Sequence, residues 1–139
     1  MAQSIREVMT ADPRTVEAGA TVAEAAREMR AGDVGSVVVV ENGAVAGIIT
    51  DRDIAVRVVA QGLDPDATRV SEAATMRPVT LTVDQTVEDA IRLVREQDVR
   101  RIIVLQDGRA AGVVSLGDLA IERDTDSALA DIASEPPNN

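Results

Sequence analysis

The apolar positions of this chain change from a helical spacing to short β-branched runs. Between residues 22 and 29, apolar side chains recur at the i, i+3, i+4 and i+7 positions that form one face of a helix. Residues 36–40 read Ser-Val-Val-Val-Val, which is typical of a strand buried on both faces. Asn-Gly at 42–43 is a strong hairpin signal. The pattern therefore predicts a helix followed by a two-stranded hairpin that returns over residues 44–49.

Polar residues mark where the predicted helices begin and end. Residues 4–7 and 21–24 each have the Ser/Thr-x-x-Glu pattern of a capping box, which begins a short helix and the apolar helix respectively. Gly-Asp at 32–33 ends the second of these. Another helix is predicted over residues 51–60, and it is apolar on nearly every side except at one arginine. A helix of this kind needs a partner on more than one face.

The second half of the chain repeats the first without a gap. Pro78 follows Pro13 at an offset of 65 residues (78 − 13 = 65), and this offset holds through the helix, the hairpin and the segment after it. Such a repeat indicates two copies of one structural unit. The matching pairs include Thr15/Thr80, Thr21/Thr86, Val22/Val87, Ala25/Ala90, Asp33/Asp98, Val34/Val99, Gly43/Gly108, Gly47/Gly112 and Asp53/Asp118.

Each copy reads β-α-β-β-α, so the expected fold class is α+β. One copy is too small to bury its sheet alone, and we expect two copies packed sheet to sheet as a pseudo-twofold pair with two related clefts. Along the chain we place repeat 1 at residues 1–62, a linker at 63–69 and repeat 2 at 70–123. Residues 124–139 are expected to form a short helix and then a disordered end.

Composition removes most catalytic chemistry. The chain has no His, Cys, Phe, Tyr or Trp, and all 14 basic residues are arginine. Serine or cysteine nucleophiles paired with histidine, Schiff-base lysines and zinc sites built from His and Cys are therefore excluded. An enzyme would have to work with carboxylates alone, for example as a metal-assisted phosphohydrolase. We therefore expect a protein that is not an enzyme and has no metal site or cofactor of its own.

Charge and hydropathy bear on partners and location. The net charge of −10 and the pI near 4.4 argue against nucleic acid and anionic membranes as partners. The first residues have no apolar signal core, and no stretch reaches membrane-spanning length. These features predict a cytoplasmic location.

One seven-residue motif occurs in both copies. Residues 47–53 read Gly-Ile-Ile-Thr-Asp-Arg-Asp, and residues 112–118 read Gly-Val-Val-Ser-Leu-Gly-Asp. A strand ends there as a helix begins, so the hydroxyl and the free N–H groups of the first turn can receive an anion. The final Asp can accept hydrogen bonds from a diol. This arrangement suits the binding of a ribose and its phosphate better than the breaking of bonds.

The duplicated motif, each copy behind a matching helix and hairpin, resembles the tandem CBS (cystathionine β-synthase) domain. The resemblance covers about residues 5–123, and the segment 50–54 is similar to small stand-alone pairs of the hypoxic response protein type. It implies regulatory binding of AMP, ADP, ATP or S-adenosylmethionine, with any magnesium carried by the nucleotide.

The resemblance also assigns ligand-binding residues. Family sites combine the motif Asp and hydroxyl with an apolar wall and with two residues of the opposite repeat. One cleft would then contain Thr50, Asp53, Ile49, Thr80 and Val99, and the other Ser115, Asp118, Val114, Thr15 and Val34.

The two clefts are expected to differ. Repeat 2 has Arg100 and Arg101 where repeat 1 has Gly and Ser, and guanidinium groups bind phosphate well. We expect the Asp118 cleft to bind nucleotide more tightly and to prefer more phosphates. The Asp53 cleft has only Arg52 and Arg57 nearby in sequence, and we expect it to bind weakly or to stay empty.

Structural roles compete with these assignments. An Asp near a helix N-terminus stabilises the helix dipole by ~0.3–1 kcal/mol whatever else it does, and Thr50 or Ser115 could simply cap a helix. The apolar helix at 54–60 is better explained as a subunit interface than as a ligand wall, so we expect a homodimer. The leading alternative to a nucleotide sensor is a structural or partner-binding CBS dimer with no physiological ligand.

Overall fold

The computed structural model describes residues 3–123, and the expected tail helix and disordered end lie outside these residues. The described chain forms two compact units. The first-repeat unit comprises residues 12–78 and 107–110. The second-repeat unit comprises residues 3–11, 79–106 and 111–123 of the described chain.

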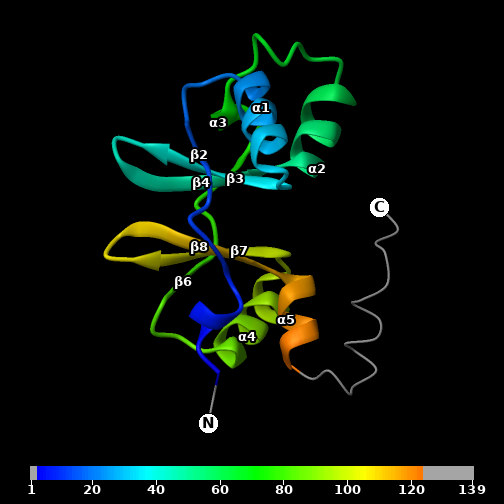
Figure 1. The fold of residues 1–139 in the computed structure, drawn as a ribbon. Helices are drawn as coiled ribbons and strands as arrows, with labels where there is room; N and C mark the ends of the chain where they lie inside the picture. The colour runs from blue at the N-terminus through cyan, green and yellow to red at the C-terminus, as the bar shows by residue number, and fades with distance from the viewer. Residues whose placement is uncertain (1–2, 124–139) are drawn as a thin grey trace. The chain divides into compact units, whose positions relative to one another are not determined.

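The first-repeat unit is a four-stranded sheet covered by helices on one face (Figure 1). The strand order is β2-β3-β4-β5, with β2 parallel to β3 and the other neighbours antiparallel. Its strands are β2 (Thr15–Glu17), β3 (Ser36–Glu41), β4 (Ala44–Thr50) and β5 (Thr75–Met76). Its helices are α1 (Val22–Gly32), α2 (Asp51–Ile54), the π-helix η2 (Ala55–Val59) and α3 (Val70–Ala73).

The second-repeat unit has the same plan, with strand order β1-β8-β7-β6. Again one outer pair, β6 with β7, is parallel. Its strands are β1 (Thr10–Ala11), β6 (Thr80–Thr82), β7 (Arg101–Gln106) and β8 (Arg109–Ser115). Its helices are the 3-10 helix η1 (Ile5–Glu7), α4 (Val87–Gln97) and α5 (Leu116–Arg123).

Each sheet takes one outer strand from the stretch of chain that precedes the other repeat. β1 pairs with β8, and β5 pairs with β4. The helices beside these strands follow the same rule, because Ile5 of η1 is fully buried in the second-repeat core and Val70 of α3 is fully buried in the first-repeat core. We call η1–β1 and α3–β5 the exchanged segments. A segment that directly precedes one repeat in the chain therefore packs in the unit of the other repeat.

The motif glycines are explained by these exchanged segments. A Cβ atom on Gly47 would lie 2.6 Å from the Thr75 carbonyl oxygen, and one on Gly112 would lie 3.0 Å from the Thr10 carbonyl oxygen. Real Cβ atoms do not approach a backbone oxygen as closely as the first of these distances. Gly47 is thus required for packing, whatever the motif binds, and Gly112 lies closely against its exchanged segment.

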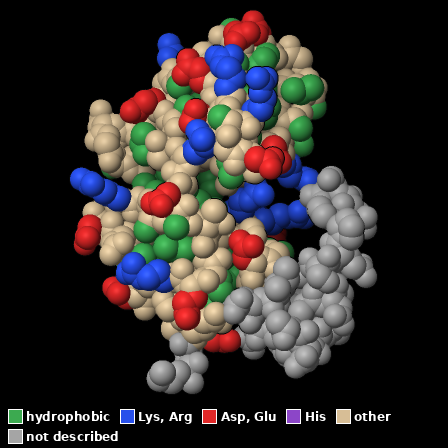
Figure 2. Space-filling view, in the orientation of Figure 1, with side chains coloured by type: hydrophobic (Ala, Val, Ile, Leu, Met, Phe, Trp, Pro, Cys, Tyr) green, Lys and Arg blue, Asp and Glu red, His purple; other side chains and the backbone are tan. Residues whose placement is uncertain are grey.

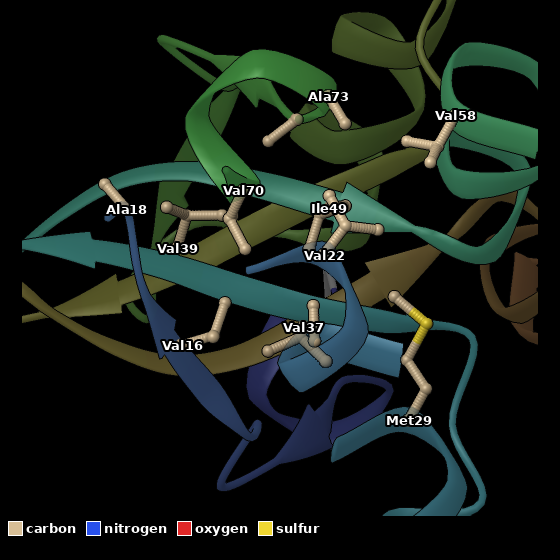
Figure 3. Close-up of a cluster of buried hydrophobic side chains, with 12 residues drawn as sticks. Val16, Ala18, Val22, Met29, Val37, Val39, Ile49, Val58, Val70 and Ala73 are labelled. Carbon is tan, nitrogen blue, oxygen red and sulfur yellow. The ribbon is translucent and has the colours of Figure 1, made fainter. Parts of the chain in front are cut away.

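Each unit has its own aliphatic core between the sheet and the helices. In the first-repeat unit, side chains from α1, β3, β4, η2 and α3 point toward one another (Figure 3). No aromatic side chain contributes, so valine, isoleucine and alanine fill the space by number. The labelled side chains are Val16, Ala18, Val22, Met29, Val37, Val39, Ile49, Val58, Val70 and Ala73.

Local predictions from the sequence are confirmed, except that the box expected at residues 21–24 is only half formed, with Thr21 accepting from the Glu24 N–H. Both hairpins turn through two residues of positive φ, Asn42-Gly43 and Asp107-Gly108, as a type I′ turn requires. The Ser4–Glu7 capping box is formed. Asp33 ends α1 in the left-handed conformation, with φ of 52°. The chain thus starts and stops its helices where local chemistry indicates.

The helix predicted over residues 51–60 departs from a regular α-helix. After the single turn of α2, residues Ala55–Val59 widen into a π-helix, and the Ala60 N–H donates to the Ala55 carbonyl at 2.9 Å. Within η2 only Val58 is buried, whereas Val56 and Val59 are 50% and 67% exposed. Within residues 3–123, no helix is long and apolar enough to cross a membrane.

Candidate functional site

Both motif copies form the same corner, where a strand becomes a helix. The Asp53 N–H donates to Thr50 Oγ1 at 3.0 Å, and the Thr50 N–H donates to Asp53 Oδ2 at 2.9 Å. Ser115 and Asp118 make the equivalent pair, each at 3.1 Å. The hydroxyl and the carboxylate therefore hold each other in a reciprocal capping box.

A capping box alone does not indicate a ligand. Thr86 and Asp89 form one with nearly the same distances, 3.0 and 3.1 Å, at the start of α4, where no motif is present. The corners differ from it because each lies at the end of a central strand of its sheet. Each corner carboxylate also uses one oxygen on the backbone, so its other oxygen has capacity for a diol.

The residue before β3 or β7 lies beside its corner. The Asp51 N–H donates to the Gly35 carbonyl at 3.0 Å, and the Leu116 N–H donates to the Arg100 carbonyl at 2.8 Å. The predicted basic pair thus begins next to the Ser115 corner, within one unit. Arg100 is exposed and Arg101 is half-buried.

Sheet alternation decides which side chains share the face of each corner hydroxyl. Ile102 belongs to the second-repeat core, so its neighbour Arg101 points to the opposite face. Val114 also belongs to that core, which places Ser115 on the opposite face together with Arg101. The structure therefore brings Arg101, rather than both arginines, to the face that carries Ser115.

The same rule corrects one sequence-based assignment. Ile49 and Val114, expected as apolar walls for adenine, are fully buried in the two helix-side cores and face away from Thr50 and Ser115. In the first-repeat unit, the Thr50 face instead carries Ile48. Thr50 pairs with Ser36 of β3, and Ile48 pairs with Val38, two residues further along the same strand. Counting alternate residues back from Thr50 would have found Ile48, and counting back from Ser115 gives Val113.

The remaining predicted residues divide between the units. Thr15 pairs with Val38, so it lies on the Thr50 face, whereas Val34 follows the left-handed Asp33 and is exposed. Because the expected clefts combine residues of both units, their assembly stays a prediction. The first-repeat unit contains Thr15, Val34, Ile49, Thr50 and Asp53, and the second-repeat unit contains Thr80, Val99, Arg100, Arg101, Val114, Ser115 and Asp118.

Arg57 is the main charged neighbour of Asp53. Its Nη1 donates to the Ala73 and Ala74 carbonyl oxygens at 3.1 and 3.4 Å, and its Nε lies 3.9 Å from Asp53 Oδ1. Sequence reasoning placed this arginine near the site but could not see that the end of α3 holds it. Elsewhere, acidic and basic side chains are interspersed over the face seen in Figure 2. Over the described residues, no group of three or more carboxylates could hold a metal ion.

Comparison with known proteins identifies the architecture. The CBS domain model matches residues 5–60 and 70–123. The chain belongs to the CBS-domain family. The expected tandem pair and its α+β fold are thereby confirmed, and CBS domains are in general regulatory modules without catalytic activity.

Individual relatives support this family assignment. A CBS domain-containing protein of Bacillus subtilis, YhcV, is 38% identical over 120 residues, covering 86% of this chain and 85% of its own length. The CBS-domain protein ATU1752 from Agrobacterium tumefaciens superposes with a TM-score of 0.75 at 29% identity, over 88% of this chain and all of its own.

Hypoxic Response Protein I, whose crystal structure carries two coordinated zinc ions, superposes with a TM-score of 0.72 at 28% identity. That match covers 85% of this chain and 97% of the other. The expected likeness to small stand-alone CBS pairs is confirmed. This chain has no His or Cys with which to bind zinc in the usual way.

Proposed function

We propose that this protein is a non-enzymatic regulatory module that binds adenosine-type nucleotides and signals by a conformational change. The observation that carries the proposal is the repeated corner in a CBS pair: Thr50 with Asp53, and Ser115 with Asp118, each at the end of a central strand. AMP, ADP, ATP and S-adenosylmethionine are the ligands to test. The module needs no cofactor of its own, and we place it in the cytoplasm.

Each part of the corner suits one part of such a ligand. The carboxylate oxygen of Asp53 or Asp118 that does not accept from the backbone accepts hydrogen bonds from the ribose hydroxyls. The hydroxyl of Thr50 or Ser115, at the positive end of a helix, can donate to a phosphate oxygen. With no aromatic ring in the chain, adenine rests on aliphatic side chains and backbone groups, with Ile48 on the same sheet face as Thr50 of the first corner.

We further propose that the second-repeat site binds more tightly and prefers more phosphates. The support is the place of Arg100, whose carbonyl accepts from the first N–H of α5, and of Arg101, which shares the Ser115 face. The first-repeat corner has Gly35 and Ser36 at the same positions. Completion of the sites by Thr80 with Val99, and by Thr15 with Val34, rests on the family resemblance.

A homodimer is part of the proposal. Val56 and Val59 on η2 and Leu63 just after it are exposed valine and leucine side chains close together in sequence. A second copy that covers them would remove this apolar surface from water. Sedimentation analysis at tens of micromolar should show a dimer that Val59→Arg weakens. A wild-type monomer there would contradict this part of the proposal.

The deciding experiment is isothermal titration calorimetry with AMP, ADP, ATP and S-adenosylmethionine on the wild type, Asp53→Ala and Asp118→Ala. Protein is quantified by peptide absorbance, because Trp and Tyr are absent. Asp89→Ala is the matched control, since it removes a capping box of the same geometry on α4. We expect micromolar binding that is lost mainly in Asp118→Ala and kept in Asp89→Ala.

The opposite result has an equally clear meaning. If folded, nucleotide-free wild-type protein gives no heat with any of the four ligands, the sensor proposal is wrong. The exposed residues of η2 would then favour the second candidate function, a structural or partner-binding CBS dimer. The next search would be for a protein partner.

A further inference from the structure

Arg57 connects three parts of the first-repeat unit. It lies one turn after Asp53, and its Nη1 donates to the carbonyl oxygens of Ala73 and Ala74, at the end of α3. On its other side, Nε lies 3.9 Å from Asp53 Oδ1. A planar guanidinium has several N–H donors in a fixed arrangement, so it can donate to carbonyls on one side while it faces a carboxylate on the other. A compact ammonium group lacks this fixed arrangement.

These contacts constrain the Asp53 carboxylate from two sides. Oδ2 accepts from the Thr50 N–H at 2.9 Å, while Oδ1 is the oxygen nearest Arg57. The Asp53 side chain is 15% exposed, so only a small part of it is open to a ligand, whereas Arg57 is 50% exposed. A group already held in its binding orientation loses less freedom when the ligand arrives.

The sequence of repeat 2 has no arginine at the equivalent position. The offset of 65 places Glu122 at the position of Arg57 (57 + 65 = 122). A carboxylate can neither donate to backbone carbonyls nor balance the charge of Asp118. The repeats therefore place their arginines differently: repeat 1 has one behind the motif Asp, and repeat 2 has its pair at the start of β7.

We propose that Arg57 is a positioning residue that orients Asp53 for a ribose diol, so that the first-repeat site selects adenosine compounds by their hydroxyls and not by their number of phosphates. The proposal rests on the proposed nucleotide-binding function and refines it. Adenosine and AMP are the ligand class of this site, and ATP gains little there. Arg57 acts through Asp53 and makes no contact with the phosphates.

The test is titration calorimetry with adenosine, AMP and ATP in an Asp118→Asn background, which reports on the first-repeat site. Arg57→Gln should weaken adenosine and AMP binding by the same factor, about 3- to 10-fold, as expected for the loss of one charged positioning contact. Arg57→Lys should recover part of the loss. Arg27→Gln is the matched control, because it removes the same charge from an exposed position on α1 that has no part in the proposed site, and it should change nothing.

Each other outcome overturns a specific statement. If Arg57→Gln leaves adenosine affinity unchanged, or weakens ATP much more than adenosine, Arg57 does not position the diol. If the wild type binds but the Asp118→Asn background binds nothing, the inference fails while the proposed function stands. If the wild type binds nothing, the proposed function fails first. Should Arg57→Gln not fold, Arg57→Lys is the deciding variant. If its adenosine affinity equals that of the wild type, the planar guanidinium is not needed.

Discussion

The two units share one architecture but differ in where they place positive charge. In the first-repeat unit, Arg57 lies behind the motif Asp and is held by the end of α3. In the second-repeat unit, Arg100 and Arg101 lie at the start of β7, beside the Ser115 corner. The hydroxyl and carboxylate of the corner are nearly the same in both. Duplication thus preserved the scaffold, and a few charged positions make the copies unequal.

The largest expected difference between the units concerns stability. Gly47→Ala places a Cβ atom 2.6 Å from the Thr75 carbonyl, so the backbone must move, at a cost of about 3 kcal/mol. Gly112→Ala meets chiefly the Met9 side chain, with Sδ 2.5 Å away, and a flexible methionine can turn aside. Denaturant unfolding should therefore show a clearly smaller loss for Gly112→Ala.

Gly117→Ala serves as the control for this comparison. Its nearest neighbour would be Ser115 Oγ at 3.8 Å, an ordinary contact, so we expect no loss of stability. Equal losses for Gly47→Ala and Gly112→Ala would contradict our account of the two exchanged strands.

The next largest expected effect concerns phosphate binding at the second-repeat site. Replacing Arg100-Arg101 by Gly-Ser gives repeat 2 the residues of repeat 1 at 35 and 36. Because hydrogen bonds to charged groups are worth ~1.5–3 kcal/mol each, ATP affinity should fall at least about tenfold. Adenosine affinity should stay within about twofold, since a ligand without phosphate has no such contact to lose. Titration calorimetry checks both, and a parallel loss for adenosine would show that the pair supports the fold instead.

The smallest effect concerns the caps of the two long helices. On α1, Thr21 accepts from the Glu24 N–H, whereas on α4 the Thr86–Asp89 box is reciprocal and Arg92 lies 2.6 Å from Asp89. The hydrogen bond from the Thr86 backbone, helped by Arg92, lowers the pKa of Asp89 below its usual 3.8. The stability that the ionised Asp89 carboxylate contributes is full above the unfolded-state pKa, and it is lost as pH falls through the lower folded-state pKa.

Asp89→Asn tests this dependence. Its unfolding free energy should lie slightly below that of the wild type at pH 7, and the difference should shrink in acid as the wild-type carboxylate takes up its proton. Thermal unfolding across a pH series measures it. A difference that stays constant down to pH 2 would show that charge on Asp89 contributes nothing.

Local features of the fold could be predicted from the sequence because a few adjacent residues determine them. The Asn42-Gly43 and Asp107-Gly108 turns need positive φ, and the Ser4 and Thr21 caps need only their own helix turn. The repeat itself is visible as an offset. These are the features for which local propensity and tertiary structure agree.

The exchanged strands and the partners of Arg57 could not be predicted in this way. β1 and β5 are two residues long, too short for an alternation to be recognised, and their partners lie far along the chain or in the preceding repeat. The carbonyls that hold Arg57 belong to a helix in another segment. The sheet face toward which Ile49 points, in contrast, follows from alternation along β4 and could have been predicted from the sequence.

The exchanged segments also set an order of events during synthesis. The first-repeat sheet has all its strands once residue 76 has left the ribosome. β1 must wait for residues 112 and 113, roughly a hundred residues after its own release, which takes on the order of 5–20 s at ordinary elongation rates. Throughout that interval Ile5, fully buried in the finished protein, has no core to enter. Residues 5–11 thus leave the ribosome before the first-repeat unit but fold after it, and a nascent chain halted after repeat 1 would display them to chaperones.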